Sequence, residues 1–258
     1  MSRNADNQRI AKNTLLLYFR MLFTMAVSLY TSRVVLNALG VEDFGIYNVV
    51  GGIVVMLSFL NGAMAGATQR FLNIELGRKD EKQLKKVFST SLIIHIGVSI
   101  VVLLLAETIG LWFLNTCMNI SENRMHAANW VYQYSVAAFI VSVISVPYNA
   151  TIIAHEKMSA FAYISILEVI LKLAIVFILI VAPFDKLILY AFLIFLVGVI
   201  IRVVYGIYCK RYFLECKLID WRPDKQLLKD MLSFSSWTIV GSLGYIFHTQ
   251  GIAVSYTH

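Results

Sequence analysis

The sequence predicts an all-α integral membrane protein, a polytopic helical bundle of six complete transmembrane helices and a truncated seventh. Of its 258 residues, 59% are hydrophobic and only 14% are charged, and the mean hydropathy is +0.74. Soluble domains are typically about 45–50% apolar and about 25% charged. The apolar residues are also gathered into long blocks, and a helix needs about 20 such residues to cross a bilayer about 30 Å thick.

The hydrophobic blocks give the predicted helices in order. Helices are expected rather than a β-barrel because each block is about twice as long as a barrel strand and lacks strict alternation. A six-helix lobe is therefore expected over residues 1–209, an amphipathic cytoplasmic connection over 210–233, and the truncated start of a second lobe over 234–258. The predicted spans are Leu15–Leu36, Phe44–Ala67, Phe88–Leu114, Trp130–Ala154, Ala160–Pro183 and Leu187–Cys209, with a seventh beginning near Phe234.

Lysine and arginine are distributed unequally between the two ends of these spans. One end carries 16 of them and the other carries 3, so the positive-inside rule places the N-terminus in the cytoplasm. The net charge of +7 is thus explained by the basic residues on the cytoplasmic side of the membrane, and no nucleic-acid partner is expected. Two basic connections, Gln69–Val87 with a helix stop at Gly77 and Lys210–Met231, are amphipathic. We expect them on the inner leaflet among anionic headgroups of membrane lipids, or as solvated loops that only set topology.

Motifs for catalysis and for cofactors are missing from the sequence. Cys117, Cys209 and Cys216 form no CxxC pattern, so no metal site is expected. The phosphate-binding pattern GxxxxGK[ST] is also absent, which excludes P-loop nucleotide hydrolysis. We expect no enzyme activity and no cofactor.

Small residues near the end of the second span predict close helix packing. Gly62 and Gly66 are four residues apart, and alanines surround them. This spacing lets two helix backbones approach closely, either within the bundle or in a dimer.

Ionisable side chains within a span are costly in hydrocarbon and mark candidate sites. Arg20 lies about six residues into the first span, and Arg202 lies about seven residues from the inner end of the sixth. Either side chain could extend to the headgroups or form a structural pair. Glu168 and Lys172 lie near the middle of the fifth span at i and i+4, so they share a helix face and can pair. They form either a structural ion pair or a site for an anionic substrate or for proton coupling.

Two segments resemble bacterial polysaccharide flippases, the O-antigen and capsule-repeat exporters of the multidrug/oligosaccharidyl-lipid/polysaccharide superfamily. The first is LGVEDFGIYNVVGG, over Leu39–Gly52, and the second is TQRFLN, over Thr68–Asn73. The resemblance extends from about Ile10 to Ala253 and concerns the N-terminal half of such a protein. It implies two helical lobes in a V around a central cavity that opens to each leaflet in turn.

The resemblance also implies a substrate and a location. Related flippases export lipid-linked oligosaccharide across the bacterial cytoplasmic (inner) membrane. Export is driven by an ion gradient or by substrate flux, so a coupling cation is a possible partner. Cationic side chains in their cavity hold the pyrophosphate of the undecaprenyl carrier. The positions here that could do so are Arg20, Arg33, Lys172 and Arg202, with Glu168 as the carboxylate available for coupling.

Three alternatives remain open at this point. A cation-coupled multidrug exporter of the same superfamily would favour acidic residues without bases, whereas the buried positions here include Arg20, Lys172 and Arg202 against Glu168. A membrane glycosyltransferase or polymerase would need a large loop with paired carboxylates, and the predicted external connections are short. The third alternative is a truncated remnant or assembly partner that does not transport.

Overall fold

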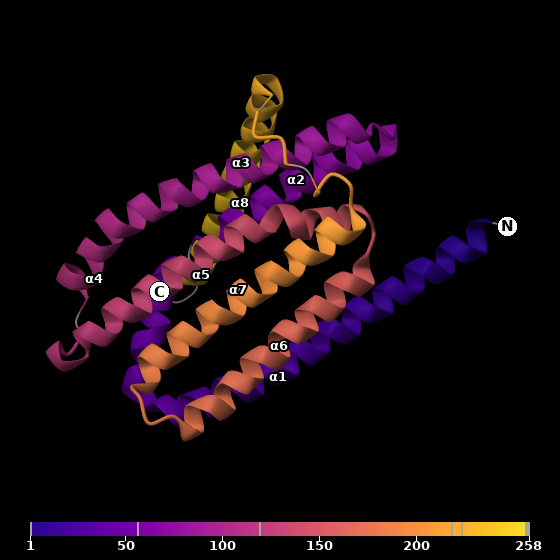
Figure 1. The fold of residues 1–258 in the computed structure, drawn as a ribbon. Helices are drawn as coiled ribbons and strands as arrows, with labels where there is room; N and C mark the ends of the chain where they lie inside the picture. The colour runs from indigo at the N-terminus through magenta and orange to yellow at the C-terminus, as the bar shows by residue number, and fades with distance from the viewer. Residues whose placement is uncertain (1, 56, 119, 218, 223, 256–258) are drawn as a thin grey trace.

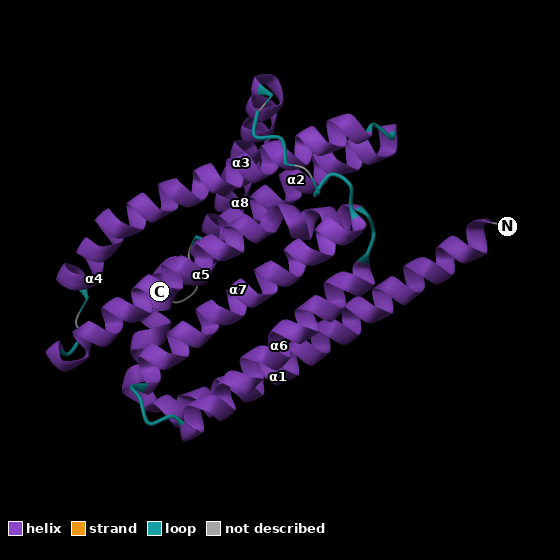
Figure 2. Ribbon diagram, in the orientation of Figure 1, coloured by secondary structure: helices purple, strands orange, loops and turns teal. Residues whose placement is uncertain are grey.

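A computed structural model describes residues 2–255 except 56, 119, 218 and 223, and these residues form a bundle of long helices (Figures 1 and 2). No strand occurs among them, which confirms the predicted all-helical class. Residues 256–258, the end of the predicted second-lobe segment, lie outside the described part. The elements are α1 (Ser2–Val55), α2 (Ser58–Arg78), α3 (Glu81–Leu105), the π-helical η1 (Ala106–Gly110), α4 (Leu111–Cys117), α5 (Glu122–Ala154), α6 (Met158–Val181), α7 (Lys186–Tyr212) and α8 (Lys225–Ser255).

Five helical segments of the described chain are long and apolar enough to cross a membrane. The first, Asn13–Val54, contains the first predicted span and the beginning of the second. The remainder of that second span lies in α2. The count of six complete crossings therefore stays a prediction. The other four segments are Glu81–Cys117, Glu122–Ala154, Met158–Val181 and Lys186–Tyr212.

A glycine divides α1 into two limbs. Gly40 has φ 82° and ψ 170°, a conformation that essentially only glycine adopts without strain. The first limb packs along α6, and Figure 1 shows the chain turning sharply at the end of this limb. The second limb runs back into the bundle and contacts α5 and α7. The segment LGVEDFG is therefore a tight reversal between two helical limbs.

The basic connection 69–87 is almost entirely helical. Helix α2 ends at Arg78, one residue beyond the stop predicted at Gly77. The chain turns at Lys79, which has a left-handed backbone with φ 58°. Asp80 then caps α3 by accepting the backbone N–H groups of Lys82 and Gln83, both at 3.0 Å. Residues 69–78 of this connection thus belong to α2, and residues 81–87 belong to α3. In the 210–233 connection, α8 already begins at Lys225.

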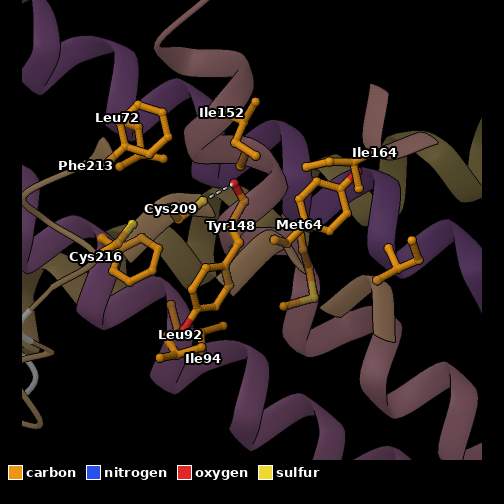
Figure 3. Close-up of a cluster of buried hydrophobic side chains, with 14 of the residues drawn as sticks. Met64, Leu72, Leu92, Ile94, Tyr148, Ile152, Ile164, Cys209, Phe213 and Cys216 are labelled. Carbon is orange, nitrogen blue, oxygen red and sulfur yellow. Dashed lines mark hydrogen bonds between the residues drawn. The ribbon is translucent and has the colours of Figure 1, made fainter. Parts of the chain in front are cut away.

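Helix α5 lies at the centre of the bundle and contacts α1, α2, α3, α6 and α7. Its Tyr148 makes an edge-on contact with Phe88 of α3, with ring centroids 5.2 Å apart. The Cys209 thiol of α7 donates a hydrogen bond to the Tyr148 carbonyl at 3.5 Å (Figure 3). A second apolar cluster packs on α5 nearer its start, around Val131 and Val143. These contacts hold the helices of the lobe at fixed positions.

Candidate functional site

Helix α6 carries an ion pair in the middle third of its 24 residues. The Lys172 ammonium donates a hydrogen bond to Glu168 Oε1 at 2.6 Å, as their i, i+4 spacing predicts. The nearer end of the helix is nine residues from Lys172, or about 13 Å along the axis. The side chains remain 41% and 36% exposed, so the pair is not sealed within the helix packing. Two charges at this depth need a polar neighbourhood.

Lys172 faces a pocket of about 240 Å³ between α1, α6 and α7. Both limbs of α1 line this pocket, because the reversal at Gly40 brings the start of the second limb beside the end of the first. The lining is rich in hydroxyl and amide groups, which can donate to or accept from a polar ligand. The polar lining residues are Ser28, Thr31, Ser32, Tyr47, Asn48, Lys172 and Tyr190.

Two features of the lining show how the pocket is built. The rings of Tyr47 and Tyr190 meet edge-on with centroids 4.7 Å apart and join the second limb of α1 to α7. The hydroxyl of Thr31 is buried and has no hydrogen-bond partner in the part of the chain that the structure describes. Buried hydroxyls are nearly always satisfied by protein, water or ligand. Thr31 therefore carries an unpaired hydroxyl in the wall of the pocket that Lys172 also lines.

Arg20 extends the polar region along α1 and α6. Its guanidinium carbon lies 4.5 Å from the ring centre of Phe161, and its buried Nε has no partner among the described residues. Arg20 and Glu168 are both electrostatic neighbours of Tyr205 on α7. The structure thus brings three of the predicted site residues, Arg20, Glu168 and Lys172, into one polar seam between α1, α6 and α7.

The other two predicted cations lie elsewhere. The Arg202 guanidinium carbon stacks 3.8 Å from the ring centre of Tyr148, at the interface of α7 with α5. Its Nη1 would lie 3.0 Å from a Cβ placed on Gly206, so the glycine leaves room for this side chain. Arg33 is exposed near the end of the first limb of α1. Neither residue lines the pocket at Lys172.

Gly62 and Gly66 lie on an exposed face of α2. A Cβ on either glycine would meet no atom of the described residues within 4 Å. The close helix approach predicted at these glycines is therefore not made within this part of the protein, and it stays a prediction.

Several polar residues of the site were not singled out from the sequence. Ser28, Thr31 and Ser32 recur at three- and four-residue spacing within an apolar span, and this polar stripe was an available signal. Tyr47 and Tyr190 are far apart in sequence and meet only through tertiary packing.

Glu107, outside this pocket, was also not singled out from the sequence. It lies in η1 and accepts a hydrogen bond from the Gln133 amide at 3.3 Å.

The arrangement is suited to binding an anionic or hydroxyl-rich group. At rest, Glu168 neutralises Lys172, which lowers the cost of holding a charge inside the membrane. An incoming phosphate oxygen can replace the carboxylate as the partner of the ammonium. Neutralisation of Glu168 by a proton or a cation would free Lys172 for that exchange. No group of three or more potential metal ligands occurs among the described residues.

Comparisons with known proteins agree with this architecture. The family model described as Polysaccharide biosynthesis protein matches residues 10–257, which confirms the resemblance read from the two motifs. No curated protein sequence matches the chain significantly. The fold is similar to solved structures described as "Crystal structure of MATE in the bent conformation" (TM-score 0.70, 16% identity) and "Crystal structure of MATE in complex with MaD3S" (0.67, 18%).

Each of these two alignments covers 90% of this chain and 53% of the solved one, so the chain spans about half the length of those structures. At such low identity the likeness concerns the fold alone. The family match, in contrast, extends over nearly the whole chain. The chain belongs to the polysaccharide biosynthesis protein family, as a multi-pass helical membrane protein with the fold of the MATE structures.

Proposed function

We propose that this protein acts in the export of lipid-linked oligosaccharide repeat units across the bacterial cytoplasmic membrane by alternating access. Its N-terminus and basic connections would face the cytoplasm. The observation that carries the proposal is the partly exposed Glu168–Lys172 pair near the middle of α6, whose Lys172 lines a hydroxyl-rich pocket. A purely structural pair would be expected to lie sealed between helices. The family match supports a role in polysaccharide biosynthesis.

Within this proposal, Lys172 contacts the diphosphate of an undecaprenyl-linked substrate. Arg20, farther along the same seam, has a guanidinium that can bind phosphate oxygens bidentately. The hydroxyl groups of the pocket would contact the first sugar. A pocket of about 240 Å³ is smaller than a typical ligand site, so it can hold one part of the substrate at a time. The remaining surface of a larger cavity would have to come from a facing lobe.

The proposal is tested by Lys172→Ala in cells that depend on this gene for surface polysaccharide. We expect loss of surface display and accumulation of lipid-linked repeat units on the inner leaflet, because the diphosphate loses its cationic partner. Lys172→Arg should retain part of the activity. Lys186→Ala, a matched loss of charge at the start of α7 and outside the pocket, should display normally. Normal display by Lys172→Ala at normal protein level would contradict the proposal.

Cation-coupled drug export is the second candidate, and the fold shared with the MATE structures favours it. In that case Glu168 would be the essential residue, because a carboxylate can bind the coupling cation. Glu168→Gln would then abolish drug resistance while Lys172→Ala would preserve it. If the protein exports saccharide, Lys172→Ala should reduce surface polysaccharide display more than Glu168→Gln does. Neither variant should then change drug resistance.

A further inference from the structure

A second pocket, of about 700 Å³, lies at the lysine-rich end of the bundle. It forms where the α2–α3 turn, the α5–α6 turn and the segment after α7 come together. Four lysines line it: Lys79, Lys82 and Lys85 from the first turn and the start of α3, and Lys157 from the second turn. Both basic connections recognised in the sequence thus contribute to one concave site, which lies outside the polar seam at Lys172.

The acidic residues of this pocket are largely engaged with other groups. Glu75 accepts a hydrogen bond from Arg78 at 3.0 Å. Asp80 accepts the two backbone N–H groups that begin α3. Glu215, only 4% exposed, lies 2.5 Å from Nε2 of His155. Glu81 is the remaining carboxylate. Four lysines therefore share the pocket with four carboxylates, and none of these lysines forms an ion pair within the described part of the chain. Because three of the carboxylates are bonded to other groups, the lysine ammonium groups stay available to an anionic ligand.

The wall of the pocket is held in place before any ligand binds. His155 stacks on Phe213 with ring centroids 4.2 Å apart, and its bond to Glu215 fixes the segment after α7 against the end of α5. Lys79 has a left-handed backbone at φ 58°, a conformation usually left to glycine or asparagine at a helix end. The turn thus keeps a lysine at the pocket despite the backbone strain.

Exposed apolar side chains also line the pocket. Tyr212 and Leu214 both line it and are both 60% exposed. Tyrosine at a helix end is typical of the membrane interface, where its ring lies at headgroup depth. Lysine ammonium groups beside exposed apolar side chains match an amphiphile, with an anionic headgroup at the lysines and hydrocarbon chains along Tyr212 and Leu214. A soluble anion would make no use of the exposed Tyr212 and Leu214.

We infer that this pocket binds the phosphate headgroup of an anionic phospholipid in the leaflet at this end of the bundle. The ammonium groups pair with the phosphate, while Tyr212 and Leu214 contact the acyl chains. The site would anchor the α2–α3, α5–α6 and α7–α8 connections to one lipid. This inference does not rest on the proposed export, since lipid binding is measured without transport.

The test compares two pairs of substitutions that remove the same charge at the same end of the bundle. Lys82→Gln with Lys85→Gln removes charge from the pocket at the start of α3. Lys225→Gln with Lys229→Gln removes equal charge at the start of α8, outside the pocket. Binding of the purified full chain to phosphatidylglycerol vesicles is measured, with phosphatidylcholine vesicles as the neutral reference. Melting temperatures of all variants are recorded alongside.

We expect the pocket pair to weaken phosphatidylglycerol binding on the order of tenfold and the α8 pair to change it by less than about twofold. Lys157→Gln, in a different turn, should weaken binding in the same direction and provides a second variant if the first fails to fold. Equal losses in the two pairs would overturn the inference, because they would reflect net charge alone. Displacement by inorganic phosphate, or binding of undecaprenyl diphosphate in place of phosphatidylglycerol, would overturn it as well.

Discussion

The apolar cluster around α5 and the polar pocket between α1, α6 and α7 lie in the same bundle and share α7, yet they are built in opposite ways. In the cluster, Phe88 is fully buried and Tyr148 is only 3% exposed. In the pocket, Lys172 is 41% exposed and the Thr31 hydroxyl lacks a partner among the described residues. The cluster buries its side chains against one another and fixes the helices. The pocket, in contrast, keeps a partly exposed charge and an unpaired hydroxyl. Substitutions in the cluster should therefore lower stability, and those in the pocket should lower export.

The largest loss of stability is expected for Phe88→Ala. Removing this buried ring leaves a cavity beside Tyr148, with an expected cost of about 3–5 kcal/mol in the free energy of unfolding. Phe177→Ala, at a ring that is 57% exposed on α6, should cost much less. Reversible unfolding in mixed micelles measures both variants. Equal costs would show that the cluster around α5 does not hold the lobe together.

Gly110→Ala tests the packing of the second apolar cluster. A Cβ at Gly110 would lie 2.9 Å from the ring carbon Cζ of Tyr132 and nearer still to its hydroxyl, which bonds the Ala106 carbonyl at 2.9 Å. Overpacking of this kind costs about 1–3 kcal/mol. Gly97→Ala, where a Cβ meets nothing within 4 Å, is the matched control.

Combining Gly110→Ala with Tyr132→Phe should cost less than the sum of the two single variants, because the clashing hydroxyl is gone. Additive costs would contradict the proposed clash.

A smaller loss is expected for Arg124→Ala, at the end of the bundle opposite the lysine pocket. Arg124 pairs with Asp43, just after the reversal at Gly40, and with Asp185, which caps α7, at 2.7 Å. Removing the cation leaves two carboxylates facing each other. Because the pairs are partly exposed, we expect a cost of about 1–2 kcal/mol.

Arg124→Ala with Asp43→Asn measures the coupling in a double-mutant cycle of unfolding free energies. A coupling energy near zero would show that the pair does not fix the reversal.

The smallest effect on stability is expected for Thr31→Val. The Thr31 hydroxyl is buried without a partner among the described residues, so its replacement by a methyl group should leave the free energy of unfolding unchanged or raise it. Export should nevertheless fall, since the wall of the pocket loses its unpaired hydroxyl. A large loss of stability with export unchanged would reverse the distinction between cluster and pocket.

The helical class and the Glu168–Lys172 pair could be predicted because both depend on local sequence: the length of an apolar block and an i, i+4 spacing. The reversal at Gly40 was harder to predict from the sequence. A polar gap between two spans predicts a loop, but a single glycine at φ 82° suffices here to turn one helix into the next.

Long-range pairing explains most of what the sequence did not reveal. Arg124 and Asp43 are 81 residues apart, and nothing local to either residue specifies the other. Tyr47 and Tyr190 likewise meet only once α1 and α7 are packed. The basic connections were recognised by composition, but their convergence on one pocket depends on how three separate turns are positioned.

The accessibility of single cysteines measures most directly whether the pocket is a water-filled path. Ser28 and Leu29 are neighbours on α1 and both are exposed, but only Ser28 lines the pocket, while Leu29 is an exposed apolar side chain that would face lipid. In a chain carrying Cys117→Ser, a water-soluble maleimide should modify Ser28→Cys and not Leu29→Cys in intact membranes. Protection of Ser28→Cys by lipid-linked substrate would follow from the same account. Equal modification of both positions, or modification of Leu29→Cys alone, would contradict it.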